Sequence, residues 1–477
     1  MRLLRVSALL ATIIIITQGA RAQSANITWT TTYQTIDGFG ASDWGTAENL
    51  SSQQADLFFS TTTGVGLSLV EEEGNEECGY STPPSGSDFS DLTTLQEAVA
   101  RGAKVVLQMA SPPISMKDSG SCGNGNLLSG SYQAYANYIV GWVQNLQSAG
   151  VPVSVVSPIT ESDVISGSPT SCPSPNIGTP NNVGGFCLTP EQMSTFIKSY
   201  LGPAITSAGL TAKIRLGDEG QWFLYNYPSS CMGDSACAAY VGILGSHAYG
   251  YYPNSNIGYY RSYACCSNPF AAPESTATGQ LWVSEVSQSG SGNAFNGTIS
   301  DGLEWAKLIH DYLTKANITG FMYWMLNGNN WYNDNEGLTD ENGIPAKRLY
   351  TIGNWSKFVR PGWVRIDTGN NNPQSGIYIT AYKDASSGAF AIVAINQNSS
   401  SASQVFSLSG FPSVAETTPW VTSSSLDLVQ QSSVSVTGNS FTYTLPAQSV
   451  TTFLGSTSAG SQNNTVAPPT ALKVVVN

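Results

Sequence analysis

Residues 131–163 read SYQAYANYIVGWVQNLQSAGVPVSVVSPITESD, and the pattern of side chains changes halfway along this stretch. The first part, 131–150, repeats apolar and aromatic residues at helical spacing and ends at a glycine. The second part, 153–158, is a short run of mostly β-branched residues, which is typical of a buried strand. A carboxylate, Glu161, follows this strand almost at once. The stretch therefore predicts one helix–strand unit of an α/β fold, with an acid placed at the strand's end.

The same alternation of patterns continues on both sides of this stretch, between residues 36 and 326. It predicts eight strands, at 36–42, 66–71, 104–110, 153–158, 213–218, 241–247, 281–285 and 320–326. A further helix is indicated at 189–209, where Thr189 can cap the first turn and Pro190 takes the first helical position. Eight such units fit the size of a (β/α)8 barrel, which we place at 36–355.

The pattern changes again from about residue 356, where short alternating strands are separated by Gly, Ser and Asn turns. This pattern predicts an antiparallel β-sandwich over 356–456. Residues 23–35 are expected to join the sandwich as an edge strand, and residues 457–477 to form a flexible tail. The predicted fold class is thus α/β, a barrel with an attached β-sandwich domain.

Residues 1–22 have the pattern of a signal peptide, with a basic start, an apolar centre and the small-x-small sequence Ala20-Arg21-Ala22. No later segment is long and apolar enough to predict a membrane span. We therefore expect a secreted, extracellular protein, in which disulfides persist. Of the eight cysteines, Cys172 with Cys187 and Cys231 with Cys237 are spaced as local disulfides.

The charge and composition narrow the class of partner. The net charge is −13, and loss of residues 1–22 would leave 16 basic against 32 acidic residues. Such a surface argues against nucleic acid and anionic membranes. The 11 Trp and 22 Tyr suit a polysaccharide or oligosaccharide, because aromatic faces stack on sugar rings. With no CxxC pair and two histidines, the sequence predicts neither a metal site nor a cofactor. We expect a monomer.

In a barrel of this kind the active site lies where the strands end and the following loops converge. Glu161 follows the fourth predicted strand and Glu285 ends the seventh, so the two carboxylates can face each other across the barrel mouth. Two facing carboxylates without a metal cluster point to glycoside hydrolysis. A serine hydrolase is disfavoured because the sequence contains no GxSxG motif.

Several other residues are candidates for the same site. His247 ends the sixth strand and is either a pocket residue or a core histidine, whereas His310 has the spacing of an outer helix. Asp218 and Glu219, at the end of the fifth strand, are the main rivals for the acid role, and the run from Glu71 to Glu77 is expected to be a solvated loop. The remaining candidate sugar contacts are Tyr249, Trp324, Trp222 and Glu71, whereas Asp163 is expected to cap the following turn.

Six sequence blocks together resemble glycoside hydrolase family 30, in that family's order. They are QTIDGFGAS, ASPPISMKDSGS, VVSPITESD, ILGSHAYG, QLWVSEVS and EGLTDENGIPAKRLYTIGNWSKFVRPGWVRID. The resemblance implies a retaining mechanism in which Glu161 is the acid/base and Glu285 the nucleophile. It also implies a sandwich rigidly attached to the barrel.

The sequence departs from the family's pattern at two candidate site residues. Thr160 stands where the family usually has Asn before the acid/base, and an Asn there would bond the sugar 2-hydroxyl. Glu71 stands where the family usually has Arg at the end of the second strand. These departures imply either an unusual substrate or weakened catalysis.

Four readings of the function therefore remain open. Xylan is the favoured substrate of a secreted retaining glycosidase that cleaves a cell-wall polysaccharide. A β-1,6-glucanase or galactanase is the next alternative, followed by a glucosylceramidase-like β-glucosidase. A protein of another class, which binds carbohydrate on a catalytically weakened scaffold, is the fourth.

Overall fold

The structure is a computed structural model that describes residues 24–44, 49–75, 78–123, 125–162, 185–220, 227–248, 280–288, 295–328 and 335–458. The predicted signal peptide and residues 459–477 of the predicted tail lie outside these ranges. Thr457, the first residue of the predicted tail, is buried, and its N–H bonds the carbonyl of Gly388. The sandwich therefore extends slightly beyond its predicted end.

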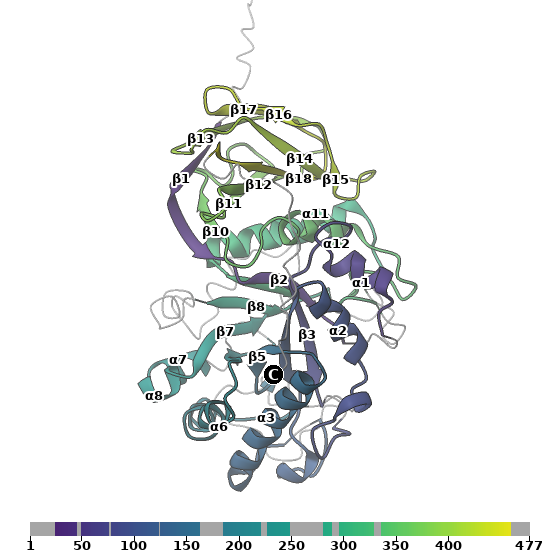
Figure 1. The fold of residues 1–477 in the computed structure, drawn as a ribbon, viewed down its shortest axis with the longest axis vertical. Coiled ribbons are helices and arrows are strands. Elements are labelled where there is room, and N and C mark those ends of the chain that lie inside the picture. Colours follow the sequence, from purple (N-terminus) through teal and green to yellow (C-terminus); the bar gives the residue numbers. More distant parts are fainter. Residues whose placement is uncertain are drawn as a thin grey trace, which may run out of the picture.

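Eight parallel strands close into a barrel in chain order (Figure 1). They are β2 (Gly38–Ser42), β3 (Leu69–Gly74), β4 (Lys104–Met109), β5 (Val153–Ser157), β6 (Lys213–Gly217), β7 (Val241–His247), β8 (Leu281–Glu285) and β9 (Gly320–Tyr323). Every predicted barrel strand is present. The second predicted strand ends later than expected, because β3 continues to Gly74 and includes Glu71 and Glu72. These two acids are buried, so the prediction of a solvated loop is wrong for them.

Helices surround the barrel strands (Figure 1). They are α1 (Ser52–Phe59), α2 (Leu92–Ala100), α3 (Tyr132–Ser148), α5 (Pro190–Phe196), α6 (Gly202–Ser207), α7 (Tyr227–Met232), α8 (Ser235–Ala238), α11 (Ile299–Asp311) and α12 (Lys347–Ser356). The predicted helix at 189–209 is formed by α5, a π-helical turn at Ile197–Leu201, and α6. Thr189 caps it as expected, through a reciprocal bond pair with Gln192.

The inside of the barrel is filled with apolar side chains over its lower part. Six inward-facing residues, one from each of six strands, form this plug: Leu69, Val106, Val155, Ile243, Trp282 and Met322. Each is at most 5% exposed. With this part of the barrel filled, the active site is expected at the ends of the strands.

The second domain is a ten-stranded sheet that folds over its own core. The order is β15 (Val429–Gln430), β14 (Glu416–Thr422), β18 (Ser449–Ser456), β12 (Ala389–Asn396), β11 (Ile377–Lys383), β10 (Val364–Asp367), β1 (Ser24–Thr35), β13 (Ala402–Ser409) and β17 (Ser440–Leu445), with β16 (Val434–Ser435) beside β14. Phe453 of β18 lies 4.9 Å from Phe406 of β13, between ring centroids, although four strands separate β18 from β13 in the sheet. This contact closes the sheet into a sandwich.

The position of β1 corrects one expectation. It lies between β10 and β13 rather than at an edge, antiparallel to the first and parallel to the second. The N-terminal segment therefore contributes an interior strand of the sandwich.

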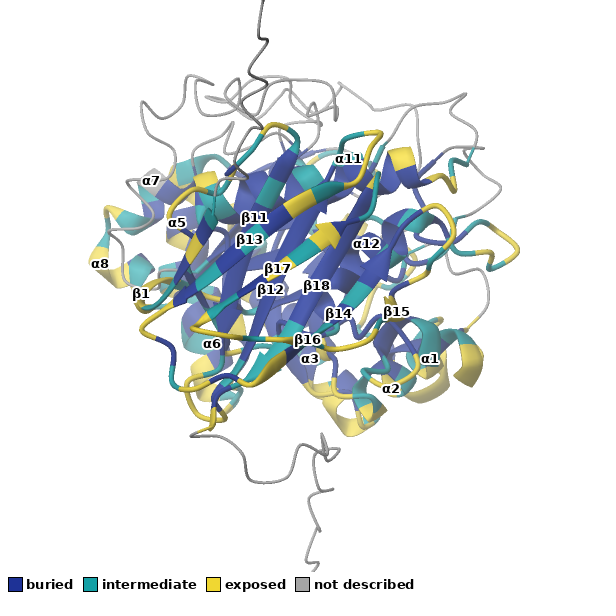
Figure 2. Ribbon diagram, turned by 90° about the horizontal axis from the view of Figure 1, so that it is seen from above, coloured by how far each residue is buried: buried dark blue, intermediate teal, exposed yellow. Residues whose placement is uncertain are grey.

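One face of the sandwich packs into the hydrophobic core of the barrel domain, and the other face encloses a separate core. Alternate residues of β12 divide between two cores: Ala391, Val393 and Ile395 pack with the barrel, whereas Phe390 and Ile392 pack inside the sandwich. Figure 2 shows that β12 and the neighbouring strands β11 and β18 are largely buried and lie over α11 and α12. His310 of α11 packs against Tyr378 of β11 at 5.5 Å, which agrees with its prediction as an outer-helix residue. None of the described helices is both long and apolar enough to cross a membrane.

Candidate active site

The two predicted carboxylates lie together at the end of the barrel where the strands finish. Glu161 follows β5 by four residues, and Glu285 is the last residue of β8. One carboxylate oxygen of each lies within 4.8 Å of the other, and a nitrogen of His247 lies within the same distance of both. The barrel therefore brings together residues that are 124 positions apart in the chain.

His247, the last residue of β7, joins the two carboxylates. Its Nδ1 is 3.0 Å from Oε1 of Glu161 and 3.4 Å from Oε2 of Glu285, and the side chain is fully buried. Burial lowers the pKa of His247, but the charge of Glu285 and the hydrogen bond to Glu161 outweigh burial and raise it from 6.5 to about 10. This pKa favours a cation at neutral pH, in a side chain that is buried and also contacts both carboxylates.

Main-chain hydrogen bonds continue the sheet beyond the strand ends and hold these loops. The N–H of Glu161 bonds the carbonyl of Asp218, and the N–H of Asp218 bonds the carbonyl of Gly245. The N–H of His247 in turn bonds the carbonyl of Glu219. Because each loop is bonded to its neighbour, the site rests on backbone rather than on free loops.

A layer of buried charge lies between the apolar plug and the carboxylate pair. Its centre is Arg215 of β6, whose Nη2 is 2.7 Å from Oε2 of Glu71 and whose Nε is 2.8 Å from Oδ2 of Asp218. All three side chains are fully buried. Burial raises the pKa of Glu71 above its usual value, and the charge of Arg215 offsets this rise only in part. Glu71, which the sequence predicts as a sugar contact, thus forms an internal ion pair with Arg215.

Thr160 is connected to the same layer. Its Oγ1 accepts a 2.9 Å hydrogen bond from Nε2 of Gln108, and Oε1 of Gln108 accepts a 2.5 Å bond from Nη2 of Arg215. Thr160 is only 9% exposed. Its hydroxyl can still donate one hydrogen bond, because the contact with Gln108 uses it as an acceptor.

An aromatic pair lies beyond the ends of β2 and β9. Trp324 directly follows β9, and its ring stacks on that of Trp44, with centroids 4.9 Å apart and planes inclined by 29°. Both side chains are partly exposed. The sequence predicts Trp324 as a sugar contact but does not point to Trp44, because a single tryptophan after a strand gives no sign of its partner.

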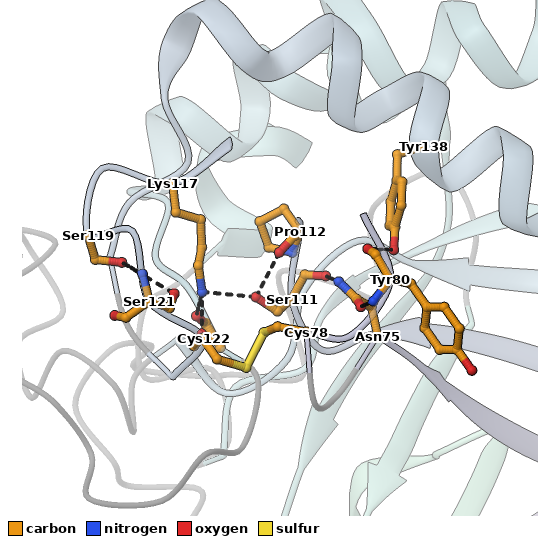
Figure 3. The surroundings of a disulfide bond; sticks show 11 residues. Asn75, Cys78, Tyr80, Ser111, Pro112, Lys117, Ser119, Ser121, Cys122 and Tyr138 are labelled. Atoms are coloured by element: carbon orange, nitrogen blue, oxygen red, sulfur yellow. Dashed lines mark hydrogen bonds between the residues drawn. A yellow bond between two sulfur atoms is a disulfide. The ribbon is translucent and has the colours of Figure 1, made fainter. Parts of the chain in front are cut away.

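The loops after β3 and β4 are joined by a disulfide (Figure 3). Cys78 pairs with Cys122, and the ammonium of the neighbouring Lys117 donates to Ser111 Oγ, to the carbonyl of Gly185 and to the carbonyl of Cys122. This disulfide was not predicted, because its cysteines are 44 residues apart.

The predicted local disulfide between Cys231 and Cys237 is present. Cys187 is also disulfide-bonded, but its predicted partner Cys172 lies outside the described residues.

Two of the remaining candidates are buried acids that follow β6. Asp218 is bound to Arg215, and Glu219 is fully buried with its Oε1 3.5 Å from the N–H of Tyr227. Asp163, Trp222 and Tyr249 lie outside the described residues.

Two groups of side chains hold possible metal-ligand atoms within 4.8 Å of one another. They are Glu161, His247 and Glu285, and Glu71, Glu73 and Glu285. In the first group, the raised pKa of His247 favours a protonated ring, which competes with metal binding. In the second group, Arg215 already pairs with Glu71.

A barrel with two carboxylates facing each other at its mouth defines a glycosidase, an enzyme that hydrolyses O-glycosyl bonds. The model of the O-glycosyl hydrolase family 30 matches residues 88–339, and the chain belongs to this family.

Similar proteins agree with this assignment. The chain is 26% identical to the glucuronoxylanase XynC of Bacillus subtilis, over 88% of this chain and 89% of the relative. A subfamily 8 xylanase of the family from Clostridium acetobutylicum superposes with a TM-score of 0.71 at 28% identity, covering 91% of this chain and 99% of the other. The catalytic domain of xylanase C from Talaromyces cellulolyticus gives 0.72 at 25% identity, covering 91% and 100%.

Proposed function

We propose that this glycosidase is a secreted β-glycanase that cleaves xylan, with Glu161 as acid/base and Glu285 as nucleophile. The short distance between the carboxylates supports these roles most directly, since an oxygen of each lies within 4.8 Å of the other. Retaining enzymes hold the pair about 5–5.5 Å apart, whereas inverting enzymes need roughly 6.5–9.5 Å to fit a water molecule.

In the first proposed step, Glu161 gives a proton to the glycosidic oxygen while Glu285 attacks the anomeric carbon. The leaving sugar departs and a glycosyl–enzyme ester remains. In the second step, Glu161 takes a proton from water, whose oxygen displaces Glu285 from the same carbon. Negative charge moves from Glu285 to Glu161 in the first step, and the imidazolium of His247, which contacts both, stabilises it at either end.

The choice of xylan rests on three observations. Relatives over most of the chain are named glucuronoxylanase or xylanase. The Trp44–Trp324 pair offers an aromatic face for a sugar ring. The acidic chain suits a polymer with little negative charge. Export is proposed from the signal pattern of residues 1–22.

A substrate panel tests this proposal. It comprises glucuronoxylan, arabinoxylan, β-1,6-glucan, β-1,6-galactan and aryl β-glucosides and β-xylosides. We expect reducing ends to be released fastest from the xylans, and proton NMR to show the β-anomer first. Faster cleavage of a β-1,6-glycan or aryl β-glucoside would replace xylan with that alternative. Binding of xylan without any hydrolysis of the panel would favour the weakened, binding-only scaffold.

A further inference from the structure

Arg215 lies beneath both proposed catalytic carboxylates and is linked to each through one intermediate residue. It is fully buried inside the barrel and pairs with Glu71 and Asp218. We propose that Arg215 is a positioning residue, which balances the charge of Glu71 beside the nucleophile and fixes the backbone that carries the acid/base. This inference rests on the roles proposed above for Glu161 and Glu285.

On the nucleophile's side, Arg215 acts through Glu71. Carboxylate oxygens of Glu71, Glu73 and Glu285 lie within 4.8 Å of one another. Like charges at this distance disfavour ionisation, yet a nucleophile must be ionised to attack. The guanidinium of Arg215, 2.7 Å from Glu71, supplies the opposite charge in a place that water and salt screen poorly.

On the acid/base's side, Arg215 acts through Asp218. The Nε of Arg215 holds the Asp218 carboxylate at 2.8 Å, and the carbonyl of Asp218 accepts the N–H of Glu161. Asp218 and Glu161 both have left-handed backbones, with φ of 56° and 44°. Residues other than glycine keep such conformations only when their surroundings hold them. Arg215 also reaches Thr160, the residue before Glu161, through Gln108.

The charges around Glu285 show how the action of Arg215 through Glu71 can be separated from its action through Asp218. The described charged groups that face it are Glu71 and Glu73 on β3, Glu161 after β5, and His247 on β7, with Asp218 behind His247. While Glu71 and Asp218 stay ionised, removing Arg215 makes the total charge of these groups and Arg215 more negative by one. Removing Arg215 and the charge of Glu71 together leaves the sum unchanged.

The test is the pH dependence of kcat/KM on xylan for R215M, E71Q and the double variant E71Q/R215M. The acidic limb reports ionisation of the nucleophile. We expect R215M to move this limb up by about 1 pH unit and E71Q to move it down. The double variant should return it to within about 0.3 unit of the wild type, with a lower maximum rate because Asp218 and Gln108 still lack their partner.

R348M is the matched control. Arg348 of α12 pairs with Asp301 of α11 at 2.9 Å, and both side chains are buried outside the barrel. Its loss should lower the melting temperature and leave the limb in place. An equal shift in R348M, or no shift in either R215M or E71Q, would overturn the proposal. If R215M does not fold, E71Q alone tests the proposal. A downward shift of the acidic limb in E71Q would support it, and an upward shift or no shift would overturn it.

A measurement without substrate separates this proposal from the proposed function. If the wild type hydrolyses nothing, the catalytic roles fail, but His247 can still be titrated by NMR in ¹⁵N-histidine-labelled protein. E71Q should then lower the pH at which His247 loses its proton, and E71Q/R215M should restore it. An unchanged titration in E71Q would refute the coupling.

Discussion

The main-chain N–H of Glu161 donates a 2.8 Å hydrogen bond to the carbonyl of Asp218, and both residues have positive φ. A left-handed backbone costs a residue other than glycine about 1–3 kcal/mol. Neighbouring strands offset this cost, since Asp218 is itself bonded to Gly245 and Arg215. The direction of the Glu161 side chain is therefore set by β6 and β7 as much as by its own strand.

The backbone of Glu161 leads to a first prediction, on stability. Glu161→Gly and Glu161→Ala both remove the carboxylate and its contact with His247, but only glycine adopts φ of 44° without strain. We expect the Gly variant to have a free energy of unfolding about 1 kcal/mol above that of the Ala variant. Urea denaturation of the pair measures this difference. Equal values would mean that the left-handed backbone at Glu161 stores no strain.

The proposed roles of the two carboxylates predict different chemical defects. Glu285→Gln should reduce turnover of every substrate by roughly 10⁴-fold or more, because an amide cannot form the glycosyl–enzyme. Glu161→Ala should keep activity on aryl glycosides with acidic leaving groups, which need no proton, and azide should accelerate it. Initial rates with and without azide distinguish the two. Loss in Glu161→Ala that is equal for all substrates and insensitive to azide would contradict the acid/base role.

His247 predicts a pH-dependent stability. Its pKa in the folded protein, about 10, lies above the 6.5 of an unfolded histidine. Its charged form therefore contributes stability fully below about pH 6.5, and this contribution is lost as the pH rises through 10. In His247→Gln we expect a smaller fall in the free energy of unfolding between pH 7 and 10 than in the wild type. Urea titrations at pH 6, 8 and 10 test this, and parallel curves would refute it.

The other histidine provides an internal reference for that experiment. Burial and the charges of Lys307 and Lys315 lower the pKa of His310 to about 3. The protein has two histidines in all, so NMR should show one neutral and one protonated ring at pH 7. Two neutral rings would remove the cation from between the carboxylates.

The sequence predicts the frame of this site well, because the frame depends on local patterns. Alternating helix and strand patterns locate all eight barrel strands, and the barrel rule then selects Glu161 and Glu285 from among the acids. Contacts between side chains that are far apart in the sequence could not be predicted in this way. Arg215 and Glu71 are 144 residues apart, and strand periodicity tells which face a side chain takes but not what it meets there. The position of β1 between β10 and β13 was missed for the same reason.

Thr160 allows a prediction about the buried hydrogen bonds. In Thr160→Val the side chain keeps its shape but loses the acceptor of Gln108 Nε2, and Gln108 is fully buried. A buried donor without a partner costs about 1–3 kcal/mol, so the free energy of unfolding should fall by that amount. Thr160→Ser retains the hydroxyl and is the control, with a smaller loss expected. Similar losses in both would show that packing of the methyl group matters more than the hydrogen bond.

The two described disulfides close loops of different length and should therefore differ in their effect on stability. Cys78 and Cys122 are 44 residues apart, whereas Cys231 and Cys237 are 6 apart. A cross-link restricts the unfolded chain more when the loop is longer, by about 4 kcal/mol for the first pair and about 2 kcal/mol for the second. Replacing each pair with serines and measuring urea denaturation tests this order.

The Cys78–Cys122 pair also joins the loops after β3 and β4 (Figure 3). Its loss should therefore raise KM on xylan, whereas the variant without the Cys231–Cys237 pair should keep the wild-type KM. A larger loss of stability from the Cys231–Cys237 pair would contradict the loop-length argument, and unchanged KM in both would mean that these loops do not support substrate binding.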